Sequence, residues 1–555
     1  MQKYSWKLPE LEFEGNLVER LLKKRFGEKL NPDDFLNPKF NLDDPFKLPD
    51  MKKAVVRIKQ AIANDEKIVI FGDYDVDGVT SCALMWELFK FLGTEVTVYI
   101  PDRFNEGYGL KESSLTNLFD GGTKLVITVD CGIRDVKLIK KMTEKGLDVI
   151  VTDHHDVADT IPECVAVVNP KRSISTYREK NLAGVGVAYG LCRALLVEMG
   201  VGEKEREWFE KWNLDLVAVG TVADMMDLTG ENRIIVKYGL KVLSKTRKKG
   251  IKKLIEKSGG EIENIDTRMI GFALGPRLNA AGRMDHAMMS YNLLTENEDI
   301  ELEIMVNNLE EHNRQRKNET DRILGEIFSR VNTDDLPVAI VENDKLWSKG
   351  VIGLVSSRVT EKYFRPSFLA QDEGEMMVGS ARGIVHINVV KVLEQVSDIL
   401  DHFGGHSMAG GFSLKKEKWD EFRSRVEKIV SQGLEGKDLH HVLEIDLEAE
   451  IDEYDDDLWY RWPQLEPFGL GNEVPKLVTK NVEIVKNSLI GKMSNHIKLF
   501  VRKNGNYSNV LWWNSADYAD RINVGARYDI VYNLNFNEYK GKRSIDLMLL
   551  DIREK

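Results

Sequence analysis

The first part of the chain alternates between short apolar runs and longer segments with helical periodicity. Between about residues 46 and 170 the runs are unbroken and rich in β-branched residues, as in KIVIFG at 67–72, LVITV at 125–129 and VIVT at 149–152. Such runs are typical of parallel strands that are buried on both faces of a sheet. The pattern predicts a doubly wound α/β domain, in which ligands bind outside the carboxyl ends of the strands.

The remainder of the chain changes character three times. Helical patterns dominate from about 182 to 260, and a long, highly charged helical stretch at 298–331 is expected to connect two lobes. A second, shorter α/β segment follows. The last part alternates apolar and polar residues between short turns, as the antiparallel strands of a small barrel or sandwich do. We therefore expect a multidomain α/β chain with these parts: an N-terminal segment at 1–45, a parallel-sheet domain at 46–297, a connecting helix at 298–331, a smaller α/β domain at 332–437 and an all-β domain at 438–555.

The composition is that of a soluble protein with several domains. The 555 residues exceed what one hydrophobic core supports, and 42% are hydrophobic and 30% charged. The N-terminus has no apolar signal core, and no apolar run reaches the ~18 residues that cross a bilayer. The four cysteines have no zinc-like spacing, which favours reduced core thiols. We expect a cytoplasmic protein.

The net charge of −12 argues mildly against a protein that simply coats nucleic acid, because phosphate binding needs Lys and Arg. Much of the acid lies in LEIDLEAEIDEYDDDLW at 443–459. Two basic clusters stand out, KTRKKGIKK at 245–253 and NRQRK at 313–317. A single basic run is usually a solvated helix face, and we interpret each cluster in that way.

Acidic residues and histidines gather where the expected buried strands end. The set comprises Asp73, Asp75, Asp77, Asp130, Asp153, His154 and His155, to which a later segment adds Asp224. Each of them alone could be a turn or a helix cap. All but Asp224 end an expected strand and would converge on one edge of the sheet, where only cations could balance their charge. Oxygen and imidazole ligands suit Mn²⁺ or Mg²⁺, and their number is enough for two ions that share a carboxylate.

In this order, DYDVDG, TVDCG, TDHH and VADMMDL resemble the four phosphoesterase motifs of the DHH superfamily. The glycine-rich FGGHSMAGGF at 403–412 resembles the motif of the associated second domain, DHHA1. PDRFNEGYGL at 101–110, GPRLNAAGRM at 275–284 and WSKGVIGLVSSR at 347–358 are similar to the RecJ branch, the single-strand-specific 5′→3′ DNA exonucleases. The resemblance implies a DHH catalytic domain, a DHHA1 domain and a C-terminal oligonucleotide-binding (OB) fold.

The resemblance also implies a metal-dependent hydrolase. The implied metal ligands are Asp73, Asp75, Asp77, Asp130, His154 and Asp224. The implied catalytic residues are Asp130, which would bridge two ions, Asp153, and His155, which would orient other groups or contact the scissile phosphate. Two Mn²⁺ or Mg²⁺ ions would bind the phosphodiester, activate a water and stabilise the leaving oxygen. Many relatives have a histidine two residues before the first aspartate, where this chain has Phe71.

An exonuclease must also recognise a strand end, and arginines can hold a terminal phosphate by paired hydrogen bonds. The DNA contacts that the resemblance implies are Arg103, Arg277, Asn279, Arg283, Ser380, Arg382 and His406. In the C-terminal domain, the candidates for base or backbone contacts are Lys492, Lys498, Trp512, Trp513 and Tyr539. Strand alternation places Trp512 and Trp513 on opposite faces, so one of them belongs to the core, and the pattern does not say which.

Two other functions are compatible with these motifs. Smaller DHH enzymes hydrolyse short oligoribonucleotides or cyclic dinucleotides, and some relatives are non-catalytic partners in replication complexes. The additional β domain favours a long polymer, and the intact acidic motifs favour an enzyme. We expect a monomeric single-stranded-DNA-specific 5′→3′ exonuclease of DNA recombination and repair, with a helicase and a single-strand-binding protein as candidate partners.

Overall fold

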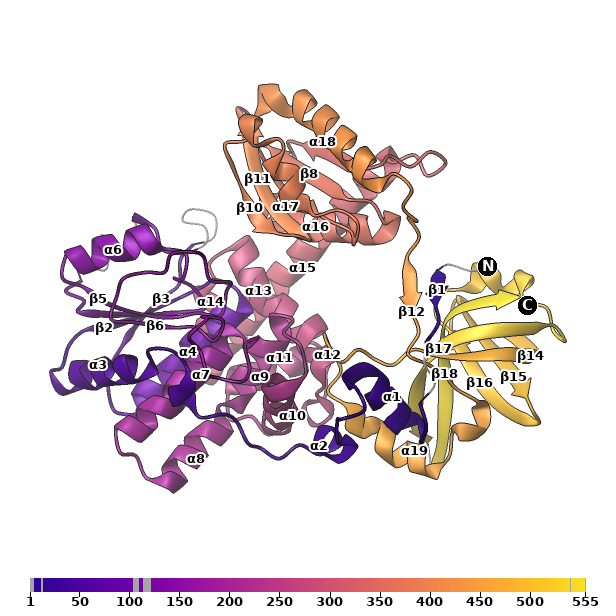
Figure 1. Ribbon diagram of the computed structural model, residues 1–555, viewed down its shortest axis with the longest axis horizontal. Helices are drawn as coiled ribbons and strands as arrows, with labels where there is room; N and C mark the ends of the chain where they lie inside the picture. The colour runs from indigo at the N-terminus through magenta and orange to yellow at the C-terminus, as the bar shows by residue number, and fades with distance from the viewer. Residues whose placement is uncertain (1–3, 11–12, 103–108, 113–120, 540, 555) are drawn as a thin grey trace. The chain divides into compact units, whose positions relative to one another are not determined.

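The computed structural model describes residues 4–10, 13–102, 109–112, 121–539 and 541–554. The chain forms two compact units (Figure 1). One spans 41–439, and the other combines 1–40 with 440–555. In the described ranges, no helix combines the length and the apolar character that a membrane span needs.

The larger unit begins with a parallel sheet of five strands in the order β3-β2-β4-β5-β6. The strands are β2 Ile68–Gly72, β3 Thr97–Tyr99, β4 Leu125–Val129, β5 Asp148–Thr152 and β6 Ala166–Val168. All residues of β2 and β4 are buried, which confirms the predicted sheet. Gly72 pairs with Val129 and Val129 pairs with Thr152, so three strands end level with one another.

Alternation along β2 divides the apolar core between the two faces of this sheet. Ile68 and Ile70 pack in one cluster with helices α3, α4 and α7, whereas Val69 and Phe71 pack in another with α6. The helices are α3 Met51–Ala63, α4 Val76–Phe91, α6 Val136–Glu144 and α7 Gly184–Glu198. Figure 1 shows α3 and α6 on opposite sides of the strands. A layer of helices on each face is the arrangement that a doubly wound sheet requires.

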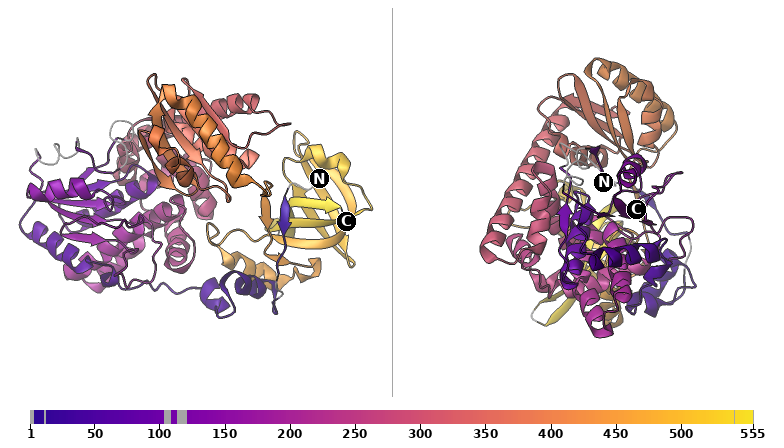
Figure 2. Two further views of the ribbon diagram at one scale, coloured as in Figure 1. Left: turned by 45° about the horizontal axis from the view of Figure 1, so that its top comes forward. Right: turned by 90° about the vertical axis from the view of Figure 1, so that its left-hand side faces the viewer.

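A helical region follows and ends in one long helix. Its elements are α8 Glu203–Trp212, α9 Leu214–Ala223, α10 Gly230–Leu243, α11 Lys249–Lys257, α12 Thr267–Met269, the π-helical turn η3 Ile270–Leu274, α13 Gly275–Met284 and α14 Met288–Thr295. Helix α15, Asp299–Arg330, is continuous over 32 residues (Figure 2). It packs against α11, α13 and α14, and also against α16 of the next sheet. This long helix therefore links the two α/β regions.

The second sheet of the larger unit is mixed, with the order β10-β11-β9-β8-β7. Only β7 and β8 pair in parallel. The strands are β7 Ile340–Asp344, β8 Ser367–Asp372, β9 Met376–Arg382, β10 His402–His406 and β11 Ala409–Lys415, and the helices are α16 Lys349–Tyr363, α17 Val389–Glu394 and α18 Trp419–Leu434. Glycines 404, 405, 410 and 411 lie on the paired strands β10 and β11.

The smaller unit is a closed five-stranded barrel, which confirms the predicted OB fold. Its strands are β14 Leu477–Ile490, β15 His496–Lys503, β16 Asn506–Trp512, β17 Arg527–Tyr539 and β18 Lys542–Glu554. Neighbours are antiparallel except β16 and β18, and pairing of β14 with β17 closes the barrel.

The N-terminal segment belongs to this smaller unit, which the sequence did not indicate. Strand β1, Ser5–Lys7, pairs with β12, Val442–Glu444. Helices α1, Leu17–Phe26, and α2, Pro32–Leu36, bury their apolar faces in the core of the barrel, beside α19, Asp456–Arg461. The two ends of the chain thus fold together.

Candidate metal centre

The turn after β2 places three aspartates close together. Asp73 follows the strand and is buried. Asp75 caps α4, and one of its carboxylate oxygens accepts hydrogen bonds from the backbone N–H groups of Asp77 at 2.9 Å and Gly78 at 3.1 Å. A side chain at Gly78 would put its Cβ 2.4 Å from the carbonyl oxygen of Asp73. The turn is therefore too tight for any residue but glycine at 78.

The third aspartate, Asp77, points at the N-terminus of α7. Its two carboxylate oxygens accept from the N–H groups of Gly184 at 2.6 Å and Val185 at 2.8 Å. These N–H groups belong to the first turn of α7, where they have no acceptor within the helix, and the helix dipole adds positive potential there. Two helix N-termini thus hold Asp75 and Asp77 in place.

Asp130 is the first residue after β4 and is fully buried. Its backbone has φ 60°, a left-handed conformation that is uncommon for residues other than glycine. A Cβ at Gly184 would lie 2.6 Å from the side chain of Asp130. Glycine at 184 therefore allows the N-terminus of α7 to approach Asp130 and Asp77 together.

His154 joins these carboxylates from the end of β5. Its Nε2 lies 3.1 Å from Oδ1 of Asp130, 3.5 Å from Oδ2 of Asp224 and 3.8 Å from Oδ2 of Asp77. Asp224 arrives from the C-terminal end of α9. The structure thus brings together residues that are up to 147 positions apart in the sequence.

Asp153 makes a different set of contacts. Its Oδ1 accepts from the backbone N–H groups of His154 and His155 and lies 2.8 Å from Nδ1 of His155, while Oδ2 accepts from the N–H of Ile133. Burial alone would raise the pKa of Asp153, but the bonds from His155 hold it below the usual value. Asp153 therefore fixes the DHH turn and the ring of His155.

The pKa values of Asp77, Asp130 and Asp224 are shifted in the opposite direction. Burial, followed by the charge of neighbouring aspartates, raises the pKa of Asp77 to about 7 and that of Asp224 to about 9. The same causes raise the pKa of Asp130 well above its usual value. Burial lowers the pKa of His154 to about 4. In the described chain, no Lys or Arg forms an ion pair with Asp77, Asp130 or Asp224.

These residues fit divalent metal ions. Oδ1 of Asp130, Oδ2 of Asp224 and both ring nitrogens of His154 are buried and have no hydrogen-bond partner in the described part of the chain. Three groups have ligand atoms within 4.8 Å of one another: Asp77 with His154 and Asp224, Asp73 with Asp75 and Asp130, and Asp130 with His154 and His155. Carboxylate oxygens with imidazole are the donors that Mn²⁺ and Mg²⁺ accept.

Phe71, where many relatives have a histidine, lies outside this polar set. Its side chain is fully buried in the apolar cluster on the α6 face of the sheet. The ring stacks on Tyr99 with centroids 5.3 Å apart. This position is an apolar packing site in the present chain.

The predicted DNA contacts of α13 have partners within the larger unit. Arg277 makes a two-pronged ion pair with Glu310 of α15, at 2.6 and 3.2 Å. Arg283 donates to the carbonyl of Gly350, and Asn279 and Arg283 line a cavity of about 130 Å³. Arg103 lies outside the described residues. The roles of these residues remain predictions.

The predicted contacts of the second sheet include an arginine that has no acidic partner among the described residues. Arg382 on β9 donates to the hydroxyl groups of Ser357 and Ser380, at 2.9 and 2.8 Å. No carboxylate pairs with it in the described chain, and burial lowers its pKa. His406 is exposed on β10. Asp156 directly follows His154 and His155. Its pKa is lowered mainly by Lys171, and the charge of His406 lowers it further.

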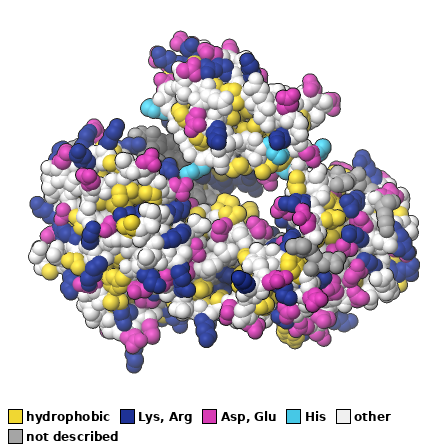
Figure 3. Space-filling model, in the orientation of Figure 1, with side chains coloured by type: hydrophobic (Ala, Val, Ile, Leu, Met, Phe, Trp, Pro, Cys, Tyr) yellow, Lys and Arg dark blue, Asp and Glu magenta, His cyan; other side chains and the backbone are white. Residues whose placement is uncertain are grey.

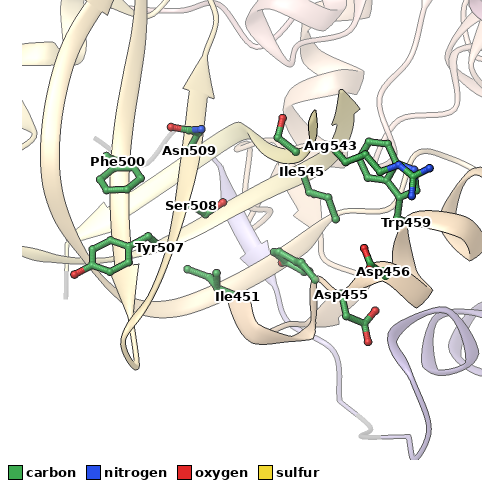
Figure 4. Close-up of a pocket in the computed structure, with 12 residues that line it drawn as sticks. Ile451, Asp455, Asp456, Trp459, Phe500, Tyr507, Ser508, Asn509, Arg543 and Ile545 are labelled. Atoms are coloured by element: carbon green, nitrogen blue, oxygen red, sulfur yellow. The ribbon is translucent and has the colours of Figure 1, made fainter. Parts of the chain in front are cut away.

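The barrel carries a groove that the sequence did not reveal. Its volume is about 590 Å³. Phe500 and Tyr507 stack with ring centroids 5.3 Å apart, and Arg543 lies over the ring of Trp459 at 5.5 Å (Figure 4). The alternation in HIKLFVRK, with buried residues at 497, 499 and 501, already directs Phe500 outward. Trp512 is the core residue of its pair, and Trp513 is half exposed.

Comparison with known proteins assigns three parts of this architecture. The model of the DHH family, N-terminal domain, matches residues 67–221, the DHHA1 domain matches 335–432, and the RecJ OB domain matches 445–551. Together with the acidic cluster, these matches define the chain as a DHH-type phosphoesterase with an added OB barrel.

Individual relatives show to which family within this class the chain belongs. The chain is 37% identical over 540 residues to the single-stranded-DNA-specific exonuclease RecJ of Bacillus subtilis (strain 168), covering 96% of this chain and 67% of that protein. It is 32% identical to the protein of the same name from Dickeya dadantii, covering 90% and 89%. The crystal structure of RecJ with Mn²⁺ from Thermus thermophilus matches with a TM-score of 0.82 and 26% identity, covering 100% of this chain and 80% of that one. The chain belongs to the RecJ family.

Proposed function

We propose that the protein is a single-stranded-DNA-specific exonuclease that degrades its substrate 5′→3′ with Mn²⁺ or Mg²⁺ as cofactor. The observation that carries this proposal is the buried cluster of Asp77, Asp130, His154 and Asp224, which lacks Lys and Arg partners among the described residues, in a chain of the RecJ family. We place the protein in the cytoplasm, as a monomer that acts in DNA recombination and repair. A helicase and a single-strand-binding protein are candidate suppliers of its substrate.

We assign one ion to Asp77, His154 and Asp224, and a second to Asp73, Asp75 and Asp130. Asp130 could serve both ions, because its carboxylate lies within reach of His154 and His155 as well as of Asp73 and Asp75. When bound, divalent ions stabilise negative charge on the phosphate and make water a stronger nucleophile. The protein contributes the fixed positions of the ligands, since the N-termini of α4 and α7 hold Asp75 and Asp77.

His155 acts on the substrate, and Asp153 is a positioning residue. The bond to Asp153 occupies Nδ1 of His155, so Nε2 is the nitrogen that can donate to an oxygen of the scissile phosphate. Burial opposes a charge on His155, but the bond to Asp153 raises its pKa. A protonated ring suits an anionic substrate.

Arg382 and Ser380 are our candidates for binding the 5′-terminal phosphate. The guanidinium is held by two serine hydroxyl groups and, in the described chain, has no carboxylate to compete with a phosphate. Arg277 is less available, because Glu310 already occupies its guanidinium group. The strand itself would follow the barrel groove, where Phe500 and Tyr507 offer a surface for base stacking. Arg543 is the cation of this groove and also makes an exposed pair with Glu538 at 3.4 Å.

A labelled-strand assay tests the activity and its direction. With Mn²⁺, 5′-labelled single strands should release short labelled products at once, whereas 3′-labelled strands should give a ladder of shortening fragments. A ladder from the 5′ label would contradict the direction. Faster hydrolysis of short oligoribonucleotides or cyclic dinucleotides would favour the alternative substrate class. Arg382→Ala should erase any preference for a 5′-phosphate over a 5′-hydroxyl end.

The barrel groove has its own test. Phe500→Ala combined with Tyr507→Ala should raise KM for a 40-nucleotide strand by about 10-fold, because stacking is worth ~1–3 kcal/mol per base. The value of kcat should not change. Leu489→Ala is the control, since it removes a half-exposed apolar side chain of β14 outside the groove. Equal effects of both variants would contradict the assignment.

A further inference from the structure

A small cavity lies between three helices of the larger unit. Helix α15 packs against both α13 and α16, which lie beside it in Figure 1. The cavity has a volume of about 130 Å³, and its lining includes Asn279 and Arg283 of α13, Arg316 of α15 and Leu354 of α16. Among the described lining residues there are two cations and no carboxylate. The charge of this cavity is therefore positive.

Arg316 has no acidic partner in the described part of the chain. Its Nη2 donates to the side-chain oxygen of Asn313 at 2.8 Å, and its Nε is buried without a hydrogen-bond partner there. Burial lowers the pKa of Arg316, and the charges of Arg358 and Arg277 lower it further. Asp321 opposes this shift but is already paired with Arg358 at 3.0 Å. A cation in such surroundings is costly unless an anion binds to it.

A nearby arginine shows how an ordinary surface residue of this helix behaves. The side chain of Arg314 is 68% exposed and pairs with Glu311, one turn away, at 2.6 Å. Arg314 thus fits the solvated helix face that we predicted for the cluster at 313–317. Arg316, two positions later, lines the cavity instead, so the prediction is wrong for this residue.

The cavity borders both the metal centre and the predicted end-binding site. Ala223, in its lining, directly precedes the predicted metal ligand Asp224. Leu354, also in the lining, follows Gly353, where a Cβ would lie 3.0 Å from Nη2 of Arg382. A strand that spans the two sites would therefore pass close to the cavity.

The size and the donors of the cavity fit a phosphate group. Its volume is well below the ~300 Å³ of the smallest common small-molecule pockets, so a whole nucleotide does not fit. Arginine offers pairs of N–H groups that match two oxygens of a phosphate. The side-chain amide of Asn279 has no hydrogen-bond partner within the described ranges and can donate through its nitrogen.

We propose that this cavity is a second phosphate-binding subsite, with Arg316 as its main cation. It is distinct from the subsite for the 5′-terminal phosphate that we assign to Ser380 and Arg382. The phosphate group comes either from the backbone of the strand, beyond the linkage that is cut, or from inorganic phosphate. The first source rests on the proposed function, whereas the second does not.

Thermal melting of the full-length chain in EDTA tests the subsite without nuclease activity. The probe is inorganic phosphate at millimolar concentration, compared with chloride at equal ionic strength. Phosphate should raise the melting temperature of the wild type and of the matched control Arg314→Gln more than that of Arg316→Gln. Without phosphate, Arg316→Gln should melt no lower than the wild type, because it removes a cation that lacks an acidic partner in the described chain. A lower value would make Arg316 a structural residue and overturn the proposal.

Release of the first nucleotide from a single strand tests the other source. Arg316→Gln should raise KM about 10-fold without changing kcat, as expected for the loss of one charge-assisted hydrogen bond. The slope of log KM against log salt should fall by about 0.7, the contribution of one phosphate in a single strand. Arg316→Lys should recover part of the loss, and Arg314→Gln should match the wild type. A neutral methylphosphonate at one linkage beyond the scissile one should weaken the wild type equally, without weakening Arg316→Gln further.

The two measurements separate the two sources. If Arg316→Gln loses phosphate stabilisation but couples to no methylphosphonate, inorganic phosphate is the ligand, and the reverse result identifies the strand. The proposal is overturned if neither effect appears. It is also overturned if Arg316→Gln couples only to removal of the 5′-terminal phosphate, because the cavity would then belong to the end-binding site. If the wild type degrades no strand, the proposed function fails, and the melting experiment alone decides on the subsite.

Discussion

Two regions of the molecule are crowded with carboxylates, and they differ in whether Lys and Arg side chains pair with them. At the carboxyl edge of the parallel sheet, Asp77, Asp130 and Asp224 are packed together without Lys or Arg partners in the described chain. In the acid-rich segment at 443–459, five of the carboxylates pair with Lys or Arg of the same unit. The pairs are Lys7–Glu444, Arg25–Asp446, Lys480–Glu448, Lys503–Glu450 and Arg20–Glu453.

The difference shows that carboxylate density alone does not indicate a metal site. Much of the charge of the acidic segment is balanced by side chains that the same unit supplies, and on the face shown in Figure 3 basic and acidic side chains are interspersed. The buried cluster is held by backbone N–H groups and faces a histidine with lowered pKa. What distinguishes a metal site is that its carboxylates are buried and have no Lys or Arg side chains to balance their charge.

Asp130→Asn should have the largest effect on this contrast. Without the bridging carboxylate, kcat for single-stranded DNA should fall by about 1,000-fold, since metal stabilisation of the transition state is worth several kcal/mol. The melting temperature in EDTA should not fall, because one repulsive charge is removed. Gel assays and thermal melting measure the two effects. Retained activity would rule out Asp130 as a ligand.

Asp446→Asn should have the reverse effects, with a loss of stability and no loss of activity. Arg25 and Asp446 are both largely buried, so the variant leaves a guanidinium without its partner. We expect a loss of about 3 kcal/mol in unfolding free energy, as when other buried pairs are broken. Hydrolysis of a short strand at low temperature should be normal. Urea denaturation measures the change, and an unchanged midpoint would show that the pair contributes nothing.

Stabilisation by bound Mn²⁺ should also distinguish the two regions, with a smaller effect. Mn²⁺ at 100 times its Kd stabilises a site by about 2.7 kcal/mol. Scanning calorimetry should show this gain over EDTA in the wild type and in Asp446→Asn. Asp130→Asn should lose most of it. A gain that survives in Asp130→Asn would place the ion elsewhere.

Lys7→Ala should have the smallest effect. Both partners of the Lys7–Glu444 pair are more than 60% exposed. Exposed pairs contribute little because water and salt screen them. Denaturation curves of the variant and the wild type should overlap within error. A shift as large as that of Asp446→Asn would mean that burial does not set the strength of these pairs.

The sequence was sufficient to predict the parallel sheet and the residues that end its strands. Buried strands have a strong apolar signal, and parallel strands must end at the same edge, so Asp73, Asp130 and His154 could be grouped without coordinates. The motif order supplied Asp224, which no strand pattern would have added. The alternating segments predicted a small barrel or sandwich, and the family resemblance narrowed this to an OB fold.

The features that depend on distant contacts could not be predicted from the sequence. Arg277 and Glu310 are 33 residues apart, and nothing local marks them as a pair. The N-terminal segment reaches the barrel across more than 400 positions, for example from Arg20 to Glu453. Alternation showed that Trp512 and Trp513 face opposite ways, but only the closed barrel decides which face is inside.

The contact between Asp77 and the N-terminus of α7 has a consequence for how the enzyme acquires its metal. Because backbone N–H groups of Gly184 and Val185 already hold this carboxylate, the site is assembled by the folded chain itself. We therefore expect ions to enter and leave the folded protein. The supply of manganese and magnesium would then decide which ion is bound, and a change in that supply would alter the enzyme without new synthesis.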